Sequence, residues 1–218
     1  MAEYTPLIRQ TLFALVAGVL LCAAHSGASA HEVQKVAPTS ASPLGVADNP
    51  DLAVIKAAPD FTLSDTADRM FSLSTLRGRV VLLSFIYTSC ITACPLLMQR
   101  MAVLQDSLKR AGLWDRSVSF VSITIDPDRD TEATLRAYAQ SFEAVDPNWR
   151  FLREQTSRLR RVLANYDEWI RPLPDGDIDH PARVYLIDRK GNIREIYALA
   201  FFDERQVLID MRTLAAEH

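Results

Sequence analysis

Two cysteines stand where they could do chemistry, in the run Cys90-Ile91-Thr92-Ala93-Cys94-Pro95. Residues 80–87 before them are a continuous β-branched, aliphatic and aromatic run, which predicts a strand buried on both faces. Pro95 favours the first turn of a helix, so the pair should lie where the strand passes into a helix. Thiols at a helix N-terminus meet unpaired N–H groups and the positive end of the helix dipole, which favour thiolates. The position therefore indicates soft-metal binding or disulfide exchange.

The spacing of the cysteines helps to distinguish soft-metal binding from disulfide exchange. Three residues separate the cysteines, one more than in the C-x-x-C pair of disulfide oxidoreductases. In a continuous helix their Cβ atoms would lie about 5–6 Å apart, beyond the roughly 3.5–4.5 Å of a disulfide. Because the residue before a proline avoids the α region, we expect Cys94 to cap the helix and Cys90 to lie in the loop. The spacing thus favours chelation, and a disulfide, catalytic or merely stabilising, stays open.

Two thiolates leave a copper or zinc ion short of ligands, and both metals are open on ligand grounds alone. His180 is the internal histidine of the chain after its N-terminal segment, while His31 and His218 are near or at chain ends. It stands in Asp179-His180-Pro181, just before a predicted strand over residues 183–187. In thioredoxin-like folds the loop entering that strand faces the cysteine pair, which makes His180 the candidate third ligand. Judged without that topology, it is a solvated loop residue.

The other elements follow from periodicity and turn residues. We predict a β-hairpin over residues 59–73, strands over 80–87, 118–125, 149–152, 183–187 and 193–199, and helices over 95–110, from about 131, over 159–166 and over 207–214. The first helix carries an apolar stripe of Leu97, Met101, Leu104 and Leu108. Asp126 and Asp130 predict a turn and a helix cap, with a supporting role beside the cysteines as the alternative. The order predicts an α/β, thioredoxin-like fold with an N-terminal β-hairpin extension and insertions.

The N-terminal residues predict export. Residues 1–30 resemble a signal peptide, with an apolar stretch over 11–24 and Ala28-Ser29-Ala30 as the cleavage pattern. Residues 31–57 predict a flexible leader, and residues 58–218 the folded domain. In a bacterium the location would be the periplasm, an oxidising compartment, or the membrane surface if the segment is retained as an anchor.

Composition excludes several classes of protein. Of 218 residues 49% are hydrophobic and 23% charged, which is ordinary for a globular chain. Lys and Arg number 24 against 27 Asp and Glu, so no basic surplus supports nucleic-acid binding. Three cysteines are too few for a disulfide-rich scaffold.

Several motifs together resemble the Sco/SenC family, the copper chaperones of cytochrome c oxidase assembly. They are residues 78–85 with Tyr87-Thr88-Ser89-Cys90 and Cys94-Pro95, the stretch Asp126-Pro127-Asp128-Arg129-Asp130-Thr131, and Asp179-His180 followed by residues 185–191. The resemblance covers residues 58–215. The chain departs from it where many members carry Pro-Asp-Val between the cysteines and this chain carries Ile91-Thr92-Ala93.

The resemblance implies that Cys90, Cys94 and His180 hold one copper ion as Cu(I) or Cu(II). It implies a copper-receiving partner, such as cytochrome c oxidase subunit II or another copper chaperone. It implies a metallochaperone, in a family that is also credited with thiol–disulfide exchange, so enzymatic activity stays open. The alternative is a periplasmic thiol–disulfide reductase in which Cys90 and Cys94 are the catalytic redox pair. His180→Ala separates the two hypotheses, because only the copper site needs the imidazole.

Overall fold

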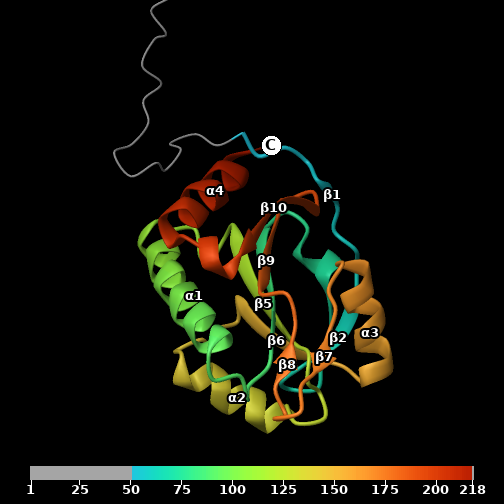
Figure 1. Cartoon of the computed structure of the whole chain (residues 1–218). Coiled ribbons are helices and arrows are strands. Elements are labelled where there is room, and N and C mark those ends of the chain that lie inside the picture. The colour runs from blue at the N-terminus through green and yellow to red at the C-terminus, as the bar shows by residue number, and fades with distance from the viewer. Residues whose placement is uncertain (1–50, 218) are drawn as a thin grey trace, which may run out of the picture. The chain divides into compact units, whose positions relative to one another are not determined.

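The computed structural model describes residues 51–217. The predicted signal peptide and residues 31–50 of the predicted leader lie outside these residues, as do His31 and His218. Figure 1 shows a central sheet with helices packed on both of its faces. None of the helices in residues 51–217 combines the length and the apolar character needed to cross a membrane.

The structure alternates strands and helices along the described chain. The strands are β1 (Lys56–Ala57), β2 (Thr62–Asp65), β3 (Met70–Ser72), β4 (Val80–Ile86), β5 (Val118–Thr124), β6 (Trp149–Arg153), β7 (Arg171–Pro172), β8 (Ile178–Asp179), β9 (Arg183–Ile187) and β10 (Asn192–Ala198). The helices are α1 (Ala93–Arg110), α2 (Glu132–Ser141), α3 (Thr156–Asn165) and α4 (Glu204–Ala216), with short 3-10 helices η1 (Leu73–Leu76) and η2 (Leu199–Phe201). The predicted α/β class and the hairpin before the central strand are confirmed.

The main sheet has eight strands in the order β1-β10-β9-β4-β5-β6-β2-β3. Strand β4 runs parallel to β5, with Val80 opposite Val118, and antiparallel to β9, with Ser84 opposite Val184. Every residue of β4 and β5 is buried, as the run of residues 80–87 predicts for β4. The antiparallel pairing places the end of β4, which leads to Cys90, beside the start of β9, which follows His180.

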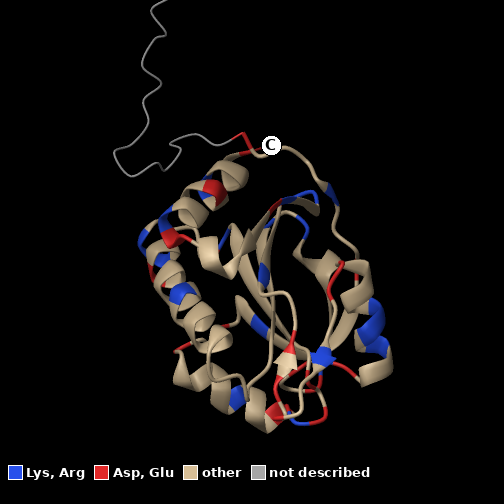
Figure 2. Cartoon of the chain, viewed as in Figure 1, with Lys and Arg blue, Asp and Glu red and all other residues tan. Residues whose placement is uncertain are grey.

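The helices cover the two faces of the sheet unequally, with α1, α2 and α4 on one side and α3 on the other (Figure 1). The predicted apolar stripe of α1 is buried, and Met98 is buried with it. On the other face Tyr166, next to α3, packs its ring edge-on against Phe85 and Tyr185 at centroid distances of 5.7 and 5.2 Å. The outer side of α3 is basic (Figure 2) and exposes Arg158, Arg160 and Arg161.

Three short strands were not predicted. Strand β1 pairs with β10, Lys56 opposite Ile193, at the end of the segment predicted to be a leader. Strands β7 and β8 form a small separate hairpin, Arg171 opposite Asp179. A two-residue strand is too short to show alternation, so only its pairing partner reveals it. Strand β8 ends at Asp179, so this hairpin leads directly into His180, the predicted third ligand.

Candidate functional site

The cysteine pair lies at the end of β4, where the loop of residues 87–92 leads into α1. Both cysteines are buried and both thiols are free. The backbone N–H of Cys94 donates to Cys90 Sγ at 3.4 Å. The expectation that Cys94 caps the helix was wrong: α1 begins at Ala93, and Cys94 lies in its first turn. Pro95 is tolerated there because the first-turn N–H groups of a helix have no intrahelical acceptor.

The two thiols have opposite ionisation tendencies. A hydrogen bond from the Cys94 thiol, helped by the Cys94 and Thr92 backbone and the Tyr87 hydroxyl, lowers the pKa of Cys90 to about 4 against the opposing effect of burial. The Cys90 thiolate and burial both raise the pKa of Cys94 above its usual value. At neutral pH the pair therefore holds one thiolate, on Cys90, and one thiol that donates to it. This is the arrangement of a nucleophile or a first metal ligand.

The Asp130 side chain holds the cysteine loop to the end of β5. Its carboxylate is fully buried and accepts from the Thr88 N–H at 3.1 Å and from the Thr88 hydroxyl at 2.5 Å. The Thr124 hydroxyl, at the end of β5, also donates to it. Thr131 rather than Asp130 caps α2, accepting from the Thr134 N–H. Asp130 thus has the supporting role that was its alternative interpretation.

His180 reaches the same end of the sheet from β8. Its ring packs edge-on against Tyr87 at a centroid distance of 5.8 Å, and its Nδ1 is buried without a hydrogen-bond partner. Burial lowers its pKa, and the Pro181 backbone together with the negative charges of Cys90 and Asp179 only partly opposes this shift. The imidazole is therefore neutral at pH 7 and has a nitrogen free to bind a metal.

Tyr87 contacts both Cys90 and His180. Its hydroxyl interacts with Cys90 and accepts a hydrogen bond of 3.4 Å from the backbone N–H of Ile178, in β8. Its ring contacts His180. The run of residues 80–87 predicts burial for Tyr87 but not these contacts, because its partner on β8 is 91 positions away.

The hydroxyl of Tyr87 should hold the β7–β8 hairpin to the cysteine loop. Tyr87→Phe is expected to speed amide hydrogen exchange at Ile178 by roughly fivefold, the worth of one hydrogen bond. Tyr197→Phe is the matched control, since its hydroxyl binds Asp210 at 2.5 Å, away from this hairpin. Unchanged exchange at Ile178 in Tyr87→Phe would show that the hairpin is held by other contacts.

The residues fit a soft metal chemically, with two sulfurs and a neutral imidazole. Within residues 51–217, however, no three His, Cys, Asp or Glu side chains are grouped closely enough to hold a metal ion. Ligation by Cys90, Cys94 and His180 together stays a prediction. Met98 and Met101 are fully buried in the core.

The fold and the site define a thioredoxin-like protein with a cysteine pair at the end of its first central strand. A family model, SCO1/SenC, matches residues 51–216, and the chain belongs to this family.

Individual relatives agree with this assignment. The SCO1 protein homolog of Bacillus subtilis is 29% identical over 140 residues, which are 63% of this chain and 71% of that protein. The structure of Bradyrhizobium japonicum ScoI with copper bound matches at TM-score 0.62 and 26% identity, over 72% of this chain and 99% of that one. BsSco, a member of the Sco family of cytochrome c oxidase assembly proteins with a disulfide switch, matches at TM-score 0.67 and 23% identity, over 78% and 99%. This last likeness supports the thioredoxin-like fold alone.

Proposed function

We propose that the protein is an exported copper-binding protein that delivers copper during assembly of cytochrome c oxidase. One copper ion would be held by the Cys90 and Cys94 thiolates and the His180 imidazole. The observation that carries the proposal is that Tyr87 contacts both Cys90 and the half-buried imidazole of His180, whose buried Nδ1 lacks a hydrogen-bond partner. The copper-bound relative ScoI supports the choice of metal.

The ionisation of the cysteines suggests how copper would be taken up. Cys90 is already a thiolate at neutral pH and would be the first ligand. Cys94 holds its proton and would release it on becoming the second ligand, because a metal binds the thiolate form. Two sulfurs suit Cu(I), and an added imidazole lets the site hold Cu(II) as well. His180 would complete the site through a shift of the segment between β8 and β9 toward the cysteines.

Copper titration of the reduced full chain tests the proposal. We expect one tightly bound copper per wild-type chain and an intense thiolate-to-Cu(II) charge-transfer band. His180→Ala should lose the band and the tight binding, while His31→Ala, a matched histidine control outside the described residues, should keep both. Wild-type protein that binds no copper tightly, with both thiols reactive, would contradict copper delivery.

A second candidate function rests on the unequal thiols. The Cys90 thiolate could attack a disulfide of a partner protein and form a mixed disulfide, releasing one partner thiolate. Cys94 would then lose its proton and attack Cys90 Sγ, forming the Cys90–Cys94 disulfide and releasing the partner as a dithiol. This reduction needs no imidazole ligand, so exchange activity that survives in His180→Ala, without copper binding in wild type, would favour it.

The location and the recipient complete the proposal. Export to the periplasm rests on the predicted signal peptide, and cell fractionation with N-terminal sequencing of the recovered protein tests it. The proposed recipient is cytochrome c oxidase subunit II or another copper chaperone. Copper transfer from the loaded protein to the purified recipient domain, followed by its Cu(II) spectrum, tests this partner.

A further inference from the structure

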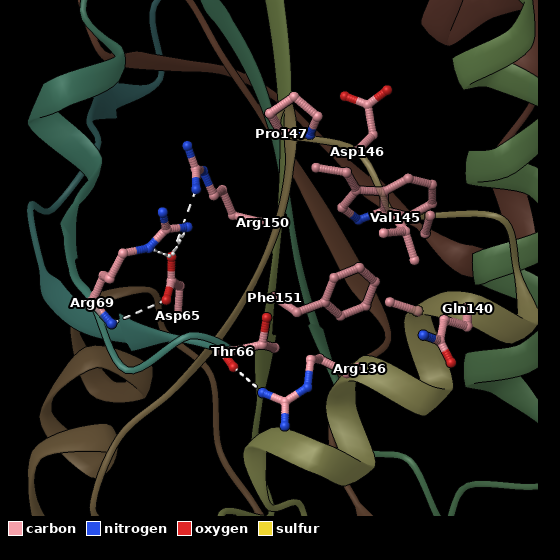
Figure 3. A pocket seen from close by; sticks show the side chains of 13 residues that line it. Asp65, Thr66, Arg69, Arg136, Gln140, Val145, Asp146, Pro147, Arg150 and Phe151 are labelled. Carbon is pink, nitrogen blue, oxygen red and sulfur yellow. Dashed lines mark hydrogen bonds and ion pairs between the residues drawn. The ribbon is translucent and has the colours of Figure 1, made fainter.

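A hollow lies away from the cysteines, near the β2–β3 edge of the sheet (Figure 3). It is formed by the β2–β3 turn, the C-terminal end of α2, the connection from α2 to β6, and β6 itself. Its volume is about 350 Å³. Strand β5 separates β6 from β4, the strand that leads to Cys90, and none of the three predicted ligands lines the hollow. The hollow is therefore separate from the cysteine site.

Three arginines from three different elements line this pocket. Arg69 comes from the β2–β3 turn, Arg136 from α2 and Arg150 from β6 (Figure 3). Their side chains are held in place: Arg69 Nη2 lies 2.8 Å and Arg150 Nη1 3.6 Å from Asp65 Oδ2. Arg136 Nη1 donates to the backbone carbonyl of Thr66. Because each guanidinium has five N–H donors, these contacts leave donors to spare on all three.

The acids of the pocket do not balance the arginines. Asp65 is buried and serves two guanidiniums at once. Asp146, the other carboxylate in the lining, has Lys109 Nζ at 3.8 Å as a partner outside the pocket. The pocket is thus locally positive in a chain whose net charge is −3. An anion would be attracted to it.

Apolar side chains form the rest of the lining. Val145, Pro147 and Phe151 line it opposite the β2–β3 turn (Figure 3). Val145 is 69% exposed, a large exposure for an aliphatic side chain. A ligand with an apolar part would remove this surface from water.

We infer that this pocket binds a small organic anion, a carboxylate or phosphate group carried on an apolar body. The planar donor fork of arginine suits both kinds of group, and the apolar wall selects against a bare inorganic ion. The volume is within the roughly 300–1,000 Å³ usual for small-molecule sites. Binding here would need neither copper nor the cysteines.

Calorimetric titration of the full chain with benzoate, phenyl phosphate and inorganic phosphate tests the inference. We expect at least one of the two aromatic anions to bind at a single site and more tightly than inorganic phosphate. Arg136→Gln should weaken that binding about tenfold, the worth of one charge-assisted hydrogen bond. Val145→Glu, at an exposed position, should abolish it by placing a negative charge beside the arginines.

Arg160→Gln is the matched control, since it makes the same change on the exposed face of α3 and should leave binding unchanged. Binding of benzoate alone identifies a carboxylate site, of phenyl phosphate alone a phosphate-ester site, and of both a shared oxyanion site. Absence of binding by both aromatic anions overturns the inference. So does inorganic phosphate binding as tightly as they do, or binding that neither Arg136→Gln nor Val145→Glu weakens.

Discussion

Alkylation of the reduced, copper-free protein at pH 5 is expected to modify Cys90 on the order of a hundredfold faster than Cys94. The pKa of Cys90 is lowered to about 4, chiefly by the hydrogen bond from the Cys94 thiol, so Cys90 is mostly thiolate at this pH. The pKa of Cys94 is raised above its ordinary value, so its thiolate is scarce. The expected ratio of the Cys90 and Cys94 alkylation rates is smaller than the ratio of their thiolate fractions, because a weakly basic thiolate is also a weaker nucleophile.

The pH dependence of the Cys90 alkylation rate tests whether the pKa of Cys90 is lowered. The Cys90 rate should rise with pH through a midpoint near 4 and stay level above about pH 5, whereas an ordinary thiol reacts faster up to pH 9. Iodoacetamide labelling followed by mass spectrometry of the two cysteines measures both rates.

Two variants at Cys94 separate the effect of the Cys94 hydrogen bond on the pKa of Cys90 from the other effects on that pKa. Cys94→Ser keeps a hydroxyl donor beside Cys90 and should leave the midpoint low. Cys94→Ala removes the donor and should move the midpoint to higher pH. A midpoint near 9 in the wild type, or equal rates for the two thiols, would contradict the asymmetric pair.

Asp130→Ala is expected to lower the free energy of unfolding by about 3 kcal/mol, one of the largest effects available to a single polar residue here. The change leaves the Thr88 N–H, the Thr88 hydroxyl and the Thr124 hydroxyl without their common acceptor. Each is a donor inside or at the edge of the core, where an unsatisfied polar group is costly. Urea denaturation followed by circular dichroism measures the loss.

Asp128→Ala is the matched control, because Asp128 is exposed in the same turn and its carboxylate accepts a long, 3.4 Å hydrogen bond from the Thr156 hydroxyl. It should cost well under 1 kcal/mol. Asp130→Asn, which keeps one acceptor oxygen, should fall between the two. A loss below about 1 kcal/mol in Asp130→Ala would mean that water satisfies the three donors.

The support from Asp130 also matters for the proposed metal site. Thr88 lies two residues before Cys90, so the hydrogen bonds at Thr88 hold the loop that presents the thiolate. Tyr87, the residue before Thr88, contacts His180. Residues 87–90 therefore connect the core both to the predicted cysteine ligands and to His180, the predicted third ligand.

The strand and the helix on either side of the cysteines were readable along the chain. The run before Cys90 predicts a buried strand, and every residue of β4 is buried. The stripe of α1 and the Pro95 signal predict the helix that follows. The helix begins at Ala93 rather than at the predicted residue 95, because a proline is tolerated anywhere in the first turn. Such features depend on neighbours a few residues apart, which a single sequence displays.

The sequence by itself determined a thiol pair at a strand–helix boundary in an α/β fold, with His180 named through topology and resemblance. Only the tertiary structure decided that Asp130 supports Thr88 from 42 positions away and that Tyr87 joins β8 across 91. It also brought together Arg69, Arg136 and Arg150 around one pocket. Hydrogen bonds and charge clusters between distant segments leave no periodicity in the chain, because their partners are fixed by strand order and packing rather than by local spacing.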